Sequence, residues 1–99
     1  MSQGVSQAEV EHSGDTVSVS GVLDFVSASE ALESVSAHIR ANDALNIDLS
    51  GVIESNSAGL ALLIEWVSVA RRGGHTVTFR HIPDSLVQLA GVCQVDGLI

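Results

Sequence analysis

Strand-like and helix-like hydrophobic patterns follow one another in a regular order along this chain. Apolar residues alternate with polar ones, or β-branched and aromatic residues cluster, in four short segments: 9–12, 16–20, 45–49 and 76–79. Apolar residues recur at helical spacing in three longer segments: 27–40, 57–72 and 83–90. The order strand, strand, helix, strand, helix, strand, helix predicts an α/β fold with a mixed sheet. We expect the helices mainly on one face, because three short helices cannot cover both.

Local signals predict where the helices begin and end. Gly73 and Gly74 follow the second helix and are typical of a helix C-terminus. Ser27, followed three residues later by Glu30, predicts a capping box at the start of the first helix. Within that helix, Ser36 falls on the side expected to face solvent.

The length of 99 residues and the mass of 10.3 kDa correspond to one small domain. A hydrophobic content of 45% is enough for a single core. Residues 1–8 are small and mostly polar, which predicts a flexible tail, so we expect the domain over 9–99. Residues 95–99 fit either a last short strand or a C-terminal tail.

Acidic residues dominate the charged composition. The chain has 12 Asp and Glu against four Arg and no Lys, which gives a net charge of −8. Nucleic acid and anionic membrane surfaces require a basic patch, so neither is expected as a direct partner. The single cysteine, the absence of an apolar leader and the absence of a membrane-length apolar run predict a cytoplasmic protein without membrane insertion.

The second helix has a wider apolar arc than docking on a sheet requires. One stripe is expected to face the sheet: Leu60, Leu63, Ile64, Val67 and Ala70. A second apolar group lies well round from it: Ala58, Leu62, Trp66 and Val69. Either the neighbouring helices cover this second group, or it is an exposed patch kept for a partner. In the second case Trp66 is the expected anchor, because tryptophan is enriched in interface hot spots.

Ser57 stands at the N-terminus of the same helix, as the cap or in the first turn. A plain capping role, with the hydroxyl bonded to a free backbone N–H, is the ordinary function of serine there. The same position also suits a phosphate, because helix N-termini present N–H donors and a partial positive charge. Ser57 is therefore either a cap or a candidate phosphorylation site.

Signals for catalysis are weak, and we expect neither an enzyme nor a cofactor. Ser57 lacks the glycine that a nucleophile elbow has two residues earlier, since Ser55 occupies that position. The four histidines share no metal-ligand spacing, and one cysteine cannot form a zinc pattern. The glycines form neither a P-loop nor a dinucleotide fingerprint.

The central segment resembles the signature of STAS domains. The residues that carry the resemblance are the strand 47–50, then Val52, then the helix start 56–60, with the sequence Asn-Ser-Ala-Gly-Leu. The turn at 14–16 and the segment 19–24 also resemble the first hairpin of that family, and the likeness covers roughly residues 9–98. It implies a STAS, SpoIIAA-like fold with a mixed sheet and about three helices on one face.

Two branches of the family imply different functions. In anti-sigma factor antagonists, the serine at the position of Ser57 is phosphorylated by a partner kinase, which switches partner binding. In MlaB-type proteins, the domain is a cytoplasmic accessory subunit that binds MlaF, the ATPase of an ABC transporter. That transporter moves phospholipids between the membranes of Gram-negative bacteria. The run 59–63, the pair Arg71 and Arg72, and the short ending are closer to the MlaB branch. Asn56 replaces the aspartate common to both branches, which weakens the phosphoswitch more, and Ala58 matches neither.

The leading hypothesis is a non-catalytic subunit that supports a transporter ATPase and so maintains outer-membrane lipid asymmetry; the alternative is an anti-sigma factor antagonist switched at Ser57. The predicted partner-binding surface begins at Asn56 and Ser57. It continues along a polar strip and an apolar edge: Ala61, Glu65 and Ser68, then Leu62, Trp66 and Val69. The expected partner is an MlaF-like ATPase in complex with a permease, and a homodimer is left open. A lipid carrier is the weakest alternative, because a core of this size leaves little room for a lipid.

Overall fold

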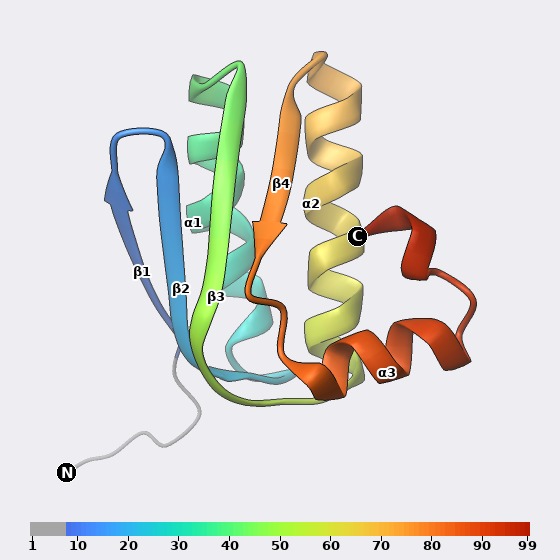
Figure 1. Cartoon of the computed structure of the whole chain (residues 1–99). Coiled ribbons are helices and arrows are strands. Elements are labelled where there is room, and N and C mark those ends of the chain that lie inside the picture. The colour runs from blue at the N-terminus through green and yellow to red at the C-terminus, as the bar shows by residue number, and fades with distance from the viewer. Residues whose placement is uncertain (1–7) are drawn as a thin grey trace, which may run out of the picture.

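The computed structural model describes residues 8–99. Most of the predicted tail, residues 1–7, lies outside the described residues, whereas Ala8 is the first residue of a strand. Figure 1 shows the elements in chain order: β1 (Ala8–Ser13), β2 (Thr16–Leu23), α1 (Ala28–Ala41), β3 (Ala44–Ser55), α2 (Ser57–Gly73), β4 (Thr76–Arg80), α3 (Asp84–Val92) and the short 3-10 helix η1 (Asp96–Leu98).

The four strands form one mixed sheet in the order β1-β2-β3-β4. β1 and β2 pair antiparallel through a tight turn, in which Gly14 has a φ of +61°. β2, β3 and β4 pair parallel, and α1 and α2 make the crossovers between them. The predicted fold class is therefore confirmed.

α1 and α2 pack on the same face of the sheet, and α3 lies near one end of α2 (Figure 1). The core lies between these layers, because alternate strand residues such as Val17, Ile47 and Leu49 point toward the helices and are fully buried. The other sheet face carries polar residues, among them Ser18 and Thr78, and no helix of the described chain covers it.

Two local predictions for α1 are wrong. Ser27 makes no capping bond to the helix; its hydroxyl donates to the Val22 carbonyl at 2.7 Å and accepts from the Asp24 N–H at 3.1 Å. The Asp24 carboxylate organises this turn instead, by accepting from the N–H groups of Val26 and Ser27. Ser36 does not face solvent but is buried, because α1 packs more of its circumference against the rest of the protein than its apolar stripe indicates.

Residues 96–98 form a short 3-10 helix rather than a strand.

Candidate functional site

The junction between β3 and α2 is fixed by Asn56. Its side-chain oxygen accepts a hydrogen bond from the Ala58 N–H at 2.8 Å, and its own N–H donates to the Leu23 carbonyl at 3.2 Å. Asn56 therefore caps α2 and ties the start of the helix to the end of β2. Ser57 is the first helical residue, and the plain capping role predicted for it is wrong because Asn56 performs it.

The side chain of Ser57 is free to meet another molecule. The residue is exposed, and within residues 8–99 its hydroxyl forms no hydrogen bond. It stands at the positive end of a helix of 17 residues whose first turn carries no acidic residue. An exposed hydroxyl at such an end can accept or donate a hydrogen bond to a partner, or receive a phosphate.

Gly59 allows the α2 terminus to approach the sheet closely. A Cβ at this position would lie 3.2 Å from the Ser55 Cβ and 3.4 Å from the Leu23 Cβ. The distance to Ser55 is tighter than ordinary packing, so a larger residue would require its neighbours to shift by a few tenths of an ångström. Gly59 therefore allows the first turn of α2 to pack directly against Ser55 and Leu23.

Large apolar side chains are exposed around this end of the molecule. Phe25 and Val26 in the β2–α1 turn are 75% and 73% exposed, and Ile53 near the end of β3 is 81% exposed. Phe25 also lines a shallow groove of about 360 Å³ together with Ala58 and Ala61 of α2. Our sequence analysis missed these residues. The available signal was two consecutive apolar residues, Phe25 and Val26, in a turn where neither strand nor helix spacing requires them.

The predicted polar strip follows the exposed side of α2. Ala61 and Glu65 are exposed, whereas Ser68 is half-buried. The Ser68 hydroxyl accepts a hydrogen bond from Arg72 at 3.0 Å, and the Arg72 guanidinium lies 3.7 Å from the Glu65 carboxylate. The far end of the strip is therefore occupied by contacts within the helix, and the free groups are those at its beginning.

Of the two alternatives for the second apolar group of this helix, cover by a neighbouring helix is correct, because α1 covers it. The prediction that the group forms an exposed partner-binding edge is therefore wrong. The Trp66 side chain is 0% exposed, and Leu62 and Val69 are also buried. The Trp66 indole N–H points at the Leu32 carbonyl of α1 at 3.4 Å, which ties the two helices together. These three residues form the seam between α1 and α2 and offer no surface to a partner in this conformation.

Comparison with known proteins identifies the family. A family model described as "Mlab, STAS domain" matches residues 6–99. The chain belongs to the STAS domain family. No curated protein sequence matches it closely enough to count as a relative.

Solved structures agree with the STAS fold. The anti-sigma factor antagonist SpoIIAA in its unphosphorylated form superposes with a TM-score of 0.65 at 14% identity, over 83% of this chain and 79% of that one. An anti-sigma factor antagonist from Mycobacterium paratuberculosis gives a TM-score of 0.60 at 30% identity, over 88% and 79% of the two chains. The structure of SLC26A9 gives 0.69 at 18% identity, over 85% of this chain but 17% of that one.

The charged groups around the site of this STAS domain are acidic. Asp24 and Glu54 border a small hollow of about 220 Å³ beside Asn56. No group of three or more potential metal-ligating side chains occurs in the part of the chain that the structure describes. None of the helices described is long and apolar enough to cross a bilayer.

Asp48, the first acidic residue of the family signature, lies on the uncovered sheet face. Its carboxylate accepts from the Ser50 N–H at 2.9 Å and lies 3.1 Å from the His81 ring. The Ser50 hydrogen bond is the main cause that lowers the pKa of Asp48, against partial desolvation and with a smaller contribution from His81. Asp48 therefore makes its contacts in the middle of β3, whereas the exposed hydroxyl of Ser57 lies at the start of α2.

Proposed function

We propose that this STAS domain is a non-catalytic subunit that binds and supports the ATPase of an ABC transporter for phospholipids. The transporter would move phospholipids between inner and outer membranes, and the domain would sit in the cytoplasm at the inner membrane through its partner. The observation that carries the proposal is the α2 N-terminal surface, defined as Asn56, Ser57, Ala61 and the exposed apolar residues Phe25, Val26 and Ile53. The Mlab description of the matching family supports this branch.

The composition of the α2 N-terminal surface suits a protein partner. Three large apolar side chains supply area that gains free energy when water is removed, and the free Ser57 hydroxyl supplies a directional contact. Asp24 and Glu54 beside it favour a partner surface that carries Lys or Arg at its rim. None of these groups forms a catalytic pair, so the contribution to ATP hydrolysis would be conformational. By binding one conformation of the ATPase more tightly, the domain would shift its equilibrium.

The test replaces Ser57 by arginine and measures recovery of the ATPase and permease with the tagged domain from detergent-solubilised host cells. Arginine adds bulk and positive charge at the positive helix end, so we expect a loss of about 2 kcal/mol or more in binding free energy, a hot-spot effect. Ser34→Arg on the exposed side of α1 is the matched control and should bind normally. Full recovery by Ser57→Arg would remove Ser57 from the interface.

The alternative function is a switch by phosphorylation of Ser57. The exposed, unbonded hydroxyl and the 30% identity to an anti-sigma factor antagonist favour it. A phosphate would add roughly −1.5 to −2 charges at the α2 N-terminal surface and block docking, because its bulk and the cost of removing its water oppose a tight apolar contact. Intact mass spectrometry of the protein from its host is the discriminating measurement. A stoichiometric phosphoform on Ser57 that changes with stress, with recovery of a serine kinase in place of the ATPase, would replace the transporter proposal.

A further inference from the structure

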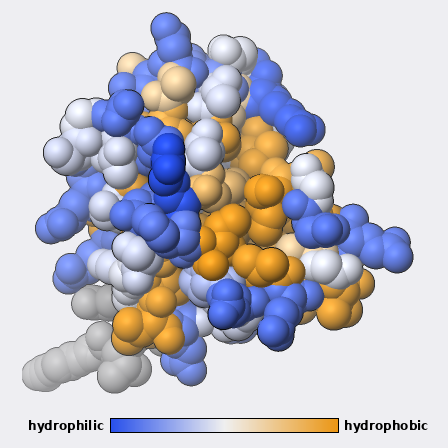
Figure 2. Space-filling view, in the orientation of Figure 1, coloured by the Kyte–Doolittle hydropathy of each residue, from blue (hydrophilic) through white to orange (hydrophobic). Residues whose placement is uncertain are grey.

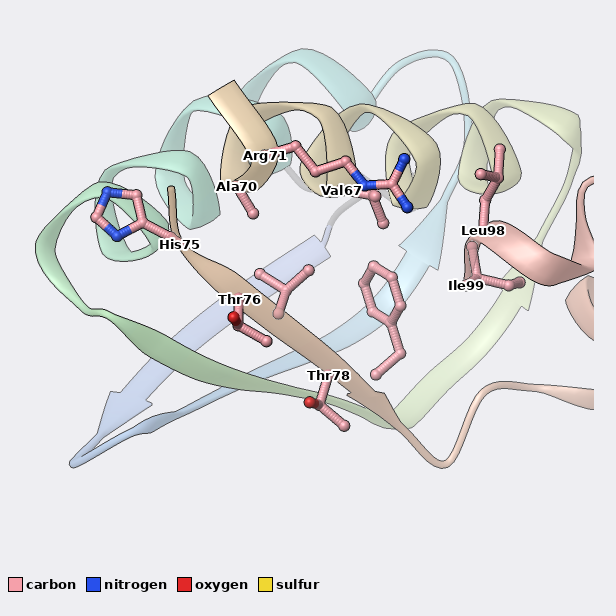
Figure 3. Close-up of a pocket in the computed structure, with 10 residues that line it drawn as sticks. Val67, Ala70, Arg71, His75, Thr76, Thr78, Leu98 and Ile99 are labelled. Carbon is pink, nitrogen blue, oxygen red and sulfur yellow. The ribbon is translucent and has the colours of Figure 1, made fainter. Parts of the chain in front are cut away.

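A second surface, on the opposite edge of the sheet from β1, has the features of a peptide-binding site. A groove of about 480 Å³ runs between α2 and β4 (Figure 3). Its apolar lining residues come from α2, β4 and the C-terminal segment: Val67, Ala70, Val77, Phe79, Leu98 and Ile99. Polar residues line the rest of the groove over a comparable area: Arg71, His75, Thr76 and Thr78. Figure 2 shows apolar surface gathered over this part of the molecule. We call this surface the β4 groove.

β4 presents unpaired main-chain groups along the β4 groove. β4 is the last strand of the sheet, and its only described partner is β3. The Thr76 N–H donates to the Asp43 carbonyl at 2.9 Å, on the β3 side. Because main-chain groups of successive strand residues point to opposite sides, those of Val77 and Phe79 point away from β3. Among residues 8–99 nothing outside the sheet bonds to them, so they form a template for one more strand.

The charged residues at the β4 groove indicate which charge a peptide bound there should carry. Arg71 extends over the groove, as Figure 3 shows, and forms no ion pair within the described residues. His75 stands at the other end, and no Asp or Glu lines the groove. The adjacent Arg72 points elsewhere and pairs with Glu65. In a chain of net charge −8, an unpaired cation over a groove that no Asp or Glu side chain lines favours an acidic ligand.

We propose that the β4 groove binds an extended acidic peptide of a partner protein, which adds to the sheet beside β4. The main chain of the peptide pairs with Val77 and Phe79. Every second side chain of the peptide faces the groove and is apolar where it meets Val67, Val77 and Phe79, and a carboxylate of the peptide bonds Arg71. A second copy of this chain is a poor occupant, because it would bring its own Arg71 and Arg80 to the same edge. The site is separate from the α2 N-terminal surface, so it does not depend on the proposed function.

The test uses a phage-displayed library of random twelve-residue peptides, selected against the full chain. We expect enriched peptides in which apolar residues alternate with polar ones and at least one residue is Asp or Glu. A synthetic copy should slow amide hydrogen exchange at Val77 and Phe79 by about tenfold or more, with little change at Thr78, whose N–H already pairs with β3. Protection elsewhere, or no enrichment, overturns the proposal.

Charge reversal at neighbouring arginines supplies the matched variants. Arg71→Glu should weaken the binding of the selected peptide by about tenfold or more, whereas Arg72→Glu should leave it within about twofold. Both residues are exposed, so both variants should keep the unfolding midpoint near that of the parent chain, as measured by circular dichroism. Equal binding by Arg71→Glu and the parent would exclude the charge contact and with it the proposed ligand. Neither outcome bears on the binding of the ATPase at Ser57.

Discussion

The beginning and the middle of α2 look alike in the sequence and differ in the folded chain. Both stretches carry apolar residues beyond those that face the sheet. In the middle, α1 covers them, so Trp66 and Val69 are core residues. At the beginning, the neighbouring β2–α1 turn leaves its own apolar residues, Phe25 and Val26, in the open. At its middle, α2 is therefore covered by a helix that completes the core, whereas at its beginning it lies beside a turn that exposes apolar side chains of its own.

Removing the indole at the seam should have the largest effect. Trp66→Ala deletes a fully buried side chain and the contact to the Leu32 carbonyl, so we expect a loss of about 3–5 kcal/mol in the free energy of unfolding. Urea denaturation followed by far-UV circular dichroism measures it. A loss below about 1 kcal/mol would break the comparison, because it would mean that Trp66 is not held in the seam and is available to a partner.

At the beginning of α2, substitutions of Asn56 and Ser57 should have different effects on stability. Asn56→Ala removes the bond to the Ala58 N–H and should cost about 1 kcal/mol of stability, whereas Ser57→Ala should change stability by less than about 0.5 kcal/mol. The same denaturation experiment compares the two variants. If Ser57→Ala costs as much as Asn56→Ala, the serine has a structural role and its availability to a partner is in doubt.

Replacing Ser36 of α1 should raise the stability of the protein, in contrast to replacing Trp66. Its hydroxyl is buried without a hydrogen-bond partner among the described residues, so Ser36→Ala should raise the free energy of unfolding, by up to about 1 kcal/mol. Ser34→Ala, on the exposed side of the same helix, is the control and should be near neutral. A clear loss of stability in Ser36→Ala would show that the Ser36 hydroxyl forms a hydrogen bond in the folded protein and would contradict this prediction.

Asp48 belongs to neither region and should have the smallest effect, with a defined pH dependence. Its pKa is lowered by folding from a value of 3.8, so its contribution is fully present above 3.8 and is lost as the pH falls through the lower, folded value. Asp48→Asn should cost less than about 1 kcal/mol at neutral pH, and the difference from the parent should shrink at about pH 3. A difference that grows on acidification would contradict the direction of the shift.

The strands and helices were predictable because their periodicities are local. The residues that pack, Leu45, Ile47 and Leu49, alternate as the one-sided sheet requires, and Gly74 ends α2 with a left-handed residue. The sequence could not predict which apolar residues of α2 are buried by α1, since this depends on the distance between the two helices in space. For the same reason the sequence left open whether Trp66 is covered or exposed, and the apolar pair Phe25 and Val26 was the only sign of the exposed turn.

Capping was misjudged at both helices for a related reason. Ser27, Asp24, Asn56 and Ser57 are all residues that cap helices well, and adjacent candidates compete. Backbone direction decides between them: Asn56 has an extended conformation and Ser57 a helical one. The start of α2 was therefore predicted to within one residue, and the structure was needed to show which of the two residues caps it.

The burial of Trp66 has an optical consequence. The chain has one tryptophan and no tyrosine, so its near-ultraviolet emission comes almost entirely from a single indole in the seam between α1 and α2. The emission of the native chain should lie toward short wavelengths and be shielded from iodide. When the partner is a variant without tryptophan, docking at Ser57 alone would leave this spectrum unchanged, whereas separation of the two helices would shift it to longer wavelengths. The protein thus carries its own label for distinguishing rigid docking from remodelling, without any added dye.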